Sequence, residues 1–223
     1  MSFFEFISEI FNWVSLVLAL ILFKRFSNAT KLISLYLIIL PIIVLFINYV
    51  AFQHHNNMYL RHLLAHFEIG IFSFYYYILF EKIMFKNLVI GLFLGYLIFS
   101  VFDTIYFEPF SIYPSNIGFV YSLMLILYSL LFFFEIYEKG EVLYIERHPQ
   151  FWINSSLLLY YAGTLLLGLF SNYLMYRIPV DKFIYLNSFF SVMTIVFNVL
   201  VCIGLSIEAY QNRKVKSEKS SLV

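Results

Sequence analysis

Long apolar runs separated by short polar breaks make up most of the chain. Seven runs have the about 20 largely apolar residues that a spanning helix needs, at approximately 3–23, 32–52, 59–80, 87–107, 117–138, 151–175 and 184–208. They are continuously apolar rather than alternating, which favours helices over membrane strands. Because the breaks are short, consecutive helices should be antiparallel neighbours. The pattern predicts an all-α integral membrane protein, with a seven-transmembrane-helix bundle over residues 1–210.

Composition agrees with this prediction and excludes one class of partner. Hydrophobic residues make up 62% of the chain and charged residues 12%, whereas ordinary soluble domains are about 45–50% apolar and about 25% charged. The excess apolar surface is more than one soluble core could bury, so the lipid bilayer is the expected partner. The net charge of +1 argues against an extended basic surface for nucleic acid.

The distribution of Lys and Arg predicts the orientation, because these residues are retained on the cytoplasmic side. With the N-terminus outside, eleven of the 14 basic residues fall on the cytoplasmic side. The three others are Arg61, Arg177 and Lys182. We therefore predict an external N-terminus and a cytoplasmic C-terminus. Residues 211–223 are predicted to form a disordered, basic cytoplasmic tail.

The third predicted span carries the densest set of ionisable residues, namely Arg61, His62, His66 and Glu68. A charged side chain within a bilayer costs about 2.5–3.5 kcal/mol on insertion scales, so each is a functional candidate. On a helix, His62 and His66 share one face, and Arg61 and Glu68 share another. Polar groups on two faces predict that this helix lies centrally, with protein or water around it.

Neighbouring predicted spans also carry polar residues near the membrane side where the ionisable residues of the third span lie. The candidate ligand-binding residues are Asn48, His62, His66, Glu68 and Asp103. Three interpretations remain open: hydrogen bonds that hold helices together, an outward-open pocket for a small ligand or ion, or a metal site. The metal candidates are His54, His55, His62 and His66, since an i,i+4 histidine pair suits one metal ion. No catalytic residue and no cofactor are expected.

Two short motifs resemble those of a known group of proteins. They are Asn57-x-x-Leu60-x-His62-x-x-x-x-Phe67-Glu68 and Phe151-Trp152-Ile153-Asn154…Leu158-x-Tyr160-x-x-Gly163. The chain resembles uncharacterised small bacterial seven-transmembrane-helix proteins that are often encoded beside sensor histidine kinases. The resemblance implies a multi-pass protein of the bacterial inner (plasma) membrane, a sensory or regulatory setting, and a histidine kinase as a partner. It assigns no catalytic residue.

Three functional hypotheses follow. The first is a receptor-like sensor that binds a small ligand or ion from outside and signals through a cytoplasmic partner. The second is a small-solute transporter, which needs a pathway through the inner half as well. The third is a membrane metalloenzyme, which needs a bound metal beside an acid or base such as Glu68. The chain has no nucleophile elbow, phosphate-binding loop or HExxH motif, so an enzyme is not the favoured hypothesis.

Overall fold

Helices form almost the entire computed structural model, which describes residues 3–140, 144–177 and 179–220. The long helices are α1 (Phe3–Leu22), α2 (Asn28–Phe52), α3 (Met58–Leu79), α4 (Ile83–Tyr106), α5 (Ser115–Glu138), α6 (Pro149–Leu169) and α8 (Val180–Ser220). Shorter ones are the 3-10 turns η1 (Phe23–Arg25) and η2 (Ile145–Arg147), and α7 (Ser171–Arg177). No strand occurs within these described ranges. The all-α prediction is confirmed.

Six of the described helices are long and apolar enough to cross a membrane: α1 with η1, α2, α4, α5, α6 and α8. The length and composition of these helices are those of a multi-pass membrane protein. Helix α3 has 22 residues but lies outside this set. Its Arg61, its two histidines, Glu68 and its tyrosines lower its hydropathy. A seventh crossing by α3 stays a prediction.

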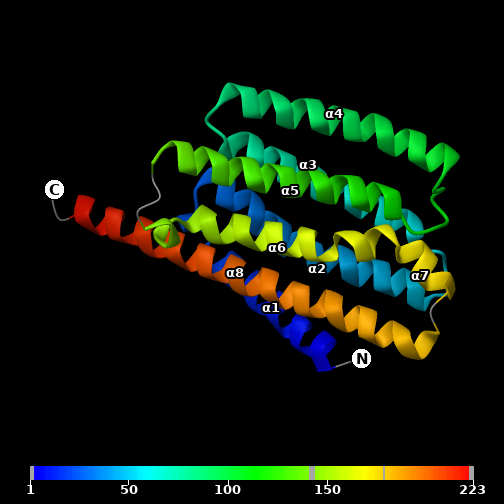
Figure 1. Ribbon diagram of the computed structural model, residues 1–223. Helices are drawn as coiled ribbons and strands as arrows, with labels where there is room; N and C mark the ends of the chain where they lie inside the picture. The colour runs from blue at the N-terminus through cyan, green and yellow to red at the C-terminus, as the bar shows by residue number, and fades with distance from the viewer. Residues whose placement is uncertain (1–2, 141–143, 178, 221–223) are drawn as a thin grey trace.

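Six helices pack in a closed ring around the middle of the bundle. The packed pairs are α1 with α2, α2 with α3, α3 with α5, α5 with α6, α6 with α8, and α8 with α1. Helix α4 packs against α3 and α5 on the outside of this ring, and it is the outermost helix in Figure 1. This order leaves α3 with neighbours on two faces, α2 and α5 within the ring and α4 outside it.

Close contact between α6 and α8 draws one end of the ring together. A Cβ atom at Gly204 would lie 2.9 Å from the Pro149 carbonyl oxygen and 2.9 Å from a side-chain carbon of Ile153. Only glycine lets the two backbones approach to this distance. Pro149 stands in the first turn of α6, where its missing N–H breaks no helical hydrogen bond.

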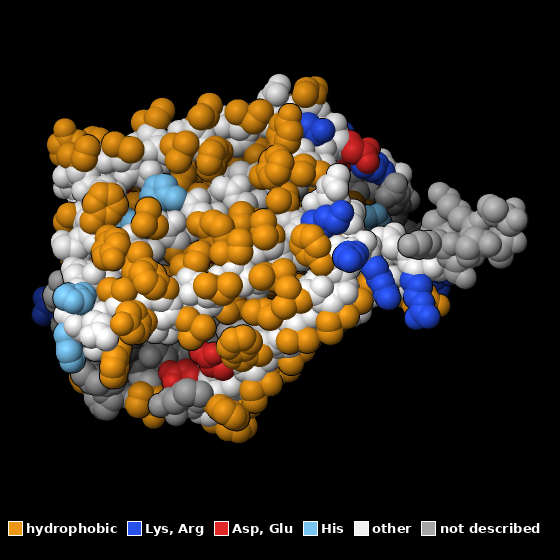
Figure 2. Space-filling view, turned by 180° about the vertical axis from the view of Figure 1, so that it is seen from behind, with side chains coloured by type: hydrophobic (Ala, Val, Ile, Leu, Met, Phe, Trp, Pro, Cys, Tyr) orange, Lys and Arg blue, Asp and Glu red, His pale blue; other side chains and the backbone are white. Residues whose placement is uncertain are grey.

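The two ends of the bundle differ in charge. Lys24 and Arg25 of η1, Lys82 and Lys86 at the start of α4, and Lys214 of α8 belong to the same end. Figure 2 shows hydrophobic side chains over the middle of one face, while Lys and Arg gather toward the end with the C-terminus. We call this end the basic end. The other end, where α1 begins, is called the opposite end.

Helix α8 continues to Ser220, through most of the segment that the sequence suggested to be a disordered tail. The structure describes residues 211–220 as part of α8, where the sequence suggested disorder, and residues 221–223 lie outside the described part of the chain. The physical reason is local. The segment Glu208–Ser220 has no proline or glycine, and its Lys, Glu, Gln and Arg residues are good helix formers.

Candidate functional site

A cavity of about 270 Å³ lies inside the ring of helices. Helices α1, α2, α3, α5, α6 and α8 all contribute to its wall. Five tyrosines line it: Tyr36, Tyr113, Tyr121, Tyr160 and Tyr161. The charged residues among the lining are Arg61 and Glu68, both from α3. The cavity is thus an aromatic chamber with one basic and one acidic side chain.

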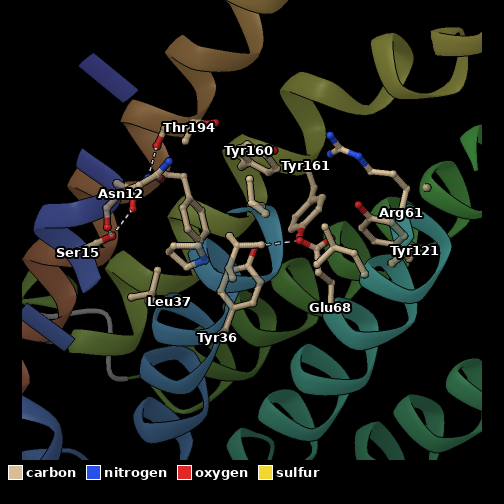
Figure 3. A pocket seen from close by; sticks show the side chains of 18 of the residues that line it. Asn12, Ser15, Tyr36, Leu37, Arg61, Glu68, Tyr121, Tyr160, Tyr161 and Thr194 are labelled. Carbon is tan, nitrogen blue, oxygen red and sulfur yellow. Dashed lines mark hydrogen bonds between the residues drawn. The ribbon is translucent and has the colours of Figure 1, made fainter. Parts of the chain in front are cut away.

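Glu68 lies on the face of α3 that is turned toward α2. The Tyr36 hydroxyl donates a hydrogen bond of 3.0 Å to Glu68 Oε1. The Tyr121 side chain lies beside the same carboxylate, and Figure 3 shows Glu68 between Tyr36 and Tyr121. A carboxylate that receives phenolic donors and faces open space is free to bind a further donor from a ligand.

Arg61 lies two turns before Glu68, toward the opposite end. It borders the chamber and also a second cavity of about 470 Å³. This second cavity, the vestibule, is lined by Glu5, Met58, Asn187 and other residues from the beginnings of α1, α3 and α8. Tyr113 and Tyr160 also border both spaces. Arg61 therefore stands where the vestibule meets the chamber.

Arg61 has no direct ion-pair partner among the described residues, and its charge acts on Glu68 only at longer range. Glu68 is seven residues further along α3, about 10 Å at a rise of about 1.5 Å per residue. An unpaired guanidinium at the mouth of a chamber is suited to bind a carboxylate or phosphate, whose geometry matches its planar fork.

Pro41 interrupts the hydrogen bonding of α2 beside the chamber. Pro41 lies inside α2, and its missing N–H leaves the carbonyl of Leu37 without the usual helical donor. Both residues line the chamber. The wall on the far side is polar too, since Ser15 donates a 2.6 Å hydrogen bond to Asn198 and Asn198 donates one of 2.8 Å to Asn12.

A network of buried side chains closes the bundle near the basic end. Glu208 of α8 accepts hydrogen bonds from the Ser27 amide (2.6 Å), from the Thr30 hydroxyl, and from Gln150 Nε2 (3.4 Å). Gln150 also donates to Thr30 (2.8 Å) and accepts from the Tyr75 hydroxyl (2.7 Å). The network, which we call the inner network, joins α2, α3, α6 and α8 in one layer.

The structure divides the predicted ligand-binding residues between the chamber, the packing of α3 with α4, and the surface of α2. Of the five, Glu68 lines the chamber. His66 is on another face of α3, where its Nε2 lies 3.0 Å from the Ser100 hydroxyl of α4. Asn48 is exposed on α2. The expected division of α3 into two polar faces is confirmed, with Glu68 and Arg61 on the chamber face.

His62 and Asp103 belong to the packing between α3, α4 and the loop before α5. His62 is fully buried, and its Nε2 lies 3.2 Å from the Ile112 carbonyl oxygen. Asp103 is 1% exposed and accepts a 2.9 Å hydrogen bond from Asn116. These contacts join α3 and α4 to the loop before α5, while His62 Nδ1 and Asp103 Oδ2 are buried without a hydrogen-bond partner among the described residues.

The same loop is held by a second carboxylate. Glu108 accepts a hydrogen bond from the Asn116 amide (2.8 Å) and another from Asn172 Nδ2 (2.8 Å). Because Glu108 is 7% exposed, burial raises the pKa of its carboxyl above the ordinary value, although these hydrogen bonds oppose the shift. Glu108 thereby connects the loop between α4 and α5 to α5 and α7.

The metal candidates do not converge. His54 and His55 are exposed in the α2–α3 loop, while His62 and His66 point to the different partners described above. In the part of the chain that the structure describes, no three His, Cys, Asp or Glu side chains gather as a metal site would require. No observation therefore favours the metalloenzyme hypothesis.

Comparison with known proteins adds no assignment. No family model, curated protein or solved structure matches the chain. The chamber itself is therefore the basis of the proposed function. Sequence reasoning found Glu68 and placed Arg61 on its face, but it did not group the five tyrosines with them. Their signal is weak because tyrosines are common throughout this chain, which has 19.

Proposed function

We propose that this protein is a seven-helix, receptor-like protein of the bacterial inner membrane that binds a small organic ligand in the chamber. The ligand enters from the extracellular side through the vestibule, and a cytoplasmic partner receives the signal. The excess of Lys and Arg at the basic end supports a cytoplasmic location for that end. The resemblance given above supports a histidine kinase as the partner.

The observation that carries this proposal is a chamber that adjoins a second cavity toward the opposite end and a hydrogen-bond network toward the basic end. The vestibule and the chamber share Arg61, Tyr113 and Tyr160. On the basic side, the hydrogen bonds between Glu208, Thr30 and Gln150 join the helices that surround the chamber. A site with access from one side is what a receptor requires.

Signalling needs two conformations with different ligand affinity. Helices α2, α6 and α8 line the chamber and also supply the inner network. A ligand that moves these helices at the chamber would change their packing at the basic end. The turn η2, between α5 and α6, lies at that end and is the proposed contact for the partner.

A small-solute transporter is the second candidate. Polar side chains continue below the chamber on α6, where Asn154 donates a 3.0 Å hydrogen bond to Tyr75 and is fully buried. Transport would require the inner network to open toward the basic end. Uptake of the stabilising ligand by sealed proteoliposomes above the rate of protein-free vesicles would support transport, whereas binding without uptake would support the receptor.

A thermal-shift screen of small organic compounds on the purified protein tests the proposed site. A ligand at one hundred times its Kd stabilises a protein by about 2.7 kcal/mol. The compound should stabilise wild type and Glu138→Gln, a matched change of an exposed residue at the basic end. It should fail to stabilise Glu68→Gln. Equal stabilisation of both variants would reject the chamber as the binding site.

A further inference from the structure

The two charges of the chamber lie on one helix face and at different depths. Arg61 borders both the vestibule and the chamber, whereas Glu68 borders the chamber alone. A ligand that passes from the vestibule therefore meets the guanidinium first and the carboxylate second. In Figure 3, Arg61 and Glu68 are both seen on α3, two turns apart, among the side chains that line the chamber.

Tyrosine rings surround the space near the carboxylate. Tyr36 hydrogen-bonds to Glu68, and Tyr161 and Tyr121 line the chamber next to it. Ring faces attract a cation electrostatically, and the attraction grows when the cation is desolvated. A carboxylate amid several rings is therefore a site for an organic ammonium group.

The mouth of the chamber, at Arg61, favours an anionic group instead of a cationic one. The Arg61 guanidinium has no acidic partner among the described side chains, and guanidinium binds carboxylate through paired hydrogen bonds. Leu37, Leu40 and Leu64 supply apolar wall around the chamber, which suits a short methylene chain between two charged ends.

We infer that the ligand is a small zwitterion with its ammonium group at Glu68 and its carboxylate at Arg61. The inference rests on the proposed function, because it assigns the chemistry of the same site. The volume of about 270 Å³ is just below the range of about 300–1,000 Å³ for sites that hold drug-sized ligands. The ligand is accordingly of amino-acid size.

Selectivity follows from the desolvation of both protein charges. A bound amine that lacks a carboxylate leaves Arg61 unpaired in the chamber, and a bound carboxylate that lacks an amine leaves Glu68 unpaired. Each unpaired buried charge is costly, so singly charged compounds bind more weakly. The site therefore selects zwitterions in two ways: it contacts both of their charges, and it leaves a protein charge unpaired when a singly charged compound binds.

The test is a binding series on the full-length protein in lipid nanodiscs. The zwitterions are unbranched amino acids that begin with glycine and lengthen by one methylene at a time up to five methylenes. Each is compared with the alkylamine and the alkanoate of the same length, and with the neutral hydroxy-amide. Isothermal titration and thermal shift provide two independent measurements of binding.

We expect one or two chain lengths to bind about tenfold or more tightly than either singly charged analogue. Arg61→Gln should remove the advantage of the zwitterion over the amine, and Glu68→Gln should remove its advantage over the carboxylate. Arg213→Gln and Glu138→Gln change exposed charges at the basic end and should leave both advantages intact. Size-exclusion profiles and melting temperatures show whether each variant is folded.

The outcomes separate this inference from the proposed function. If an amine, an alkanoate or a neutral compound binds as tightly as every zwitterion and still requires the chamber residues, the chamber is a ligand site and the zwitterion assignment is wrong. If zwitterions bind equally to wild type and to both chamber variants, the assigned positions are wrong. If no compound of any charge binds here or in the wider screen, the inference and the proposed function both fail.

Discussion

Two glutamates, Glu68 of α3 and Glu208 of α8, show how the two halves of the bundle differ. Glu208 is 5% exposed and accepts hydrogen bonds from Ser27, Thr30 and Gln150. Glu68 is only partly buried, faces the chamber and accepts a hydrogen bond from Tyr36. The first carboxylate accepts three hydrogen bonds from the protein, whereas the second borders a cavity from which another molecule can donate to it.

This difference assigns opposite roles to residues of the same chemical type. The inner network stabilises the contact of α2, α6 and α8, because each member hydrogen-bonds to a different helix. The chamber is a place where protein groups are incompletely paired, which costs stability and permits binding. Three predictions test this comparison.

The largest effect is expected at Glu208. Glu208→Ala removes the acceptor for three donors and leaves Thr30 and Gln150 incompletely paired. We expect a loss of roughly 2–4 kcal/mol in unfolding free energy, measured by unfolding in mixed micelles. Glu138→Ala, at an exposed surface ion pair with Lys82, should cost less than about 1 kcal/mol. A similar loss for both would mean that the inner network does not hold the helices together.

A smaller effect on stability is expected at Glu68. Glu68→Gln keeps a carbonyl oxygen that can accept from Tyr36 and removes a charge that faces the chamber. Unfolding free energy should change by less than about 1 kcal/mol, while ligand-dependent stabilisation is lost. The measurement is the same unfolding curve with and without ligand. A loss as large as that of Glu208→Ala would show that Glu68 is a structural residue.

The smallest effect concerns the pH dependence of stability that Glu108 sets in the loop between α4 and α5. Burial raises the pKa of its carboxyl in the folded protein, so folding is favoured when the group is protonated. The contribution is present below the ordinary carboxyl pKa and is lost as pH rises from there through the raised folded value. The melting temperature of wild type relative to Glu108→Gln should therefore fall with increasing pH across this window. A rise with pH would mean that the hydrogen bonds from Asn116 and Asn172 outweigh burial.

Only part of the candidate site could be predicted from the sequence. Helical periodicity placed Arg61 and Glu68 on one face of α3 and His62 and His66 on another, because face membership depends on spacing within one helix. It could not say which face meets the chamber. The packing partners decide that: α4 supplies Ser100 to His66, and α2 supplies Tyr36 to Glu68.

The sequence by itself determined that the chain is a multi-pass helical membrane protein, because long apolar runs have few other stable structures in which backbone groups stay paired. It also determined the charge difference between the two ends. Only the tertiary structure decided that six helices form a ring, that α4 lies outside it, and that five tyrosines meet Glu68 in one chamber. The physical reason is that these contacts join residues such as Tyr36 and Tyr161, which lie far apart in the chain and whose proximity depends on the order of the helices around the ring.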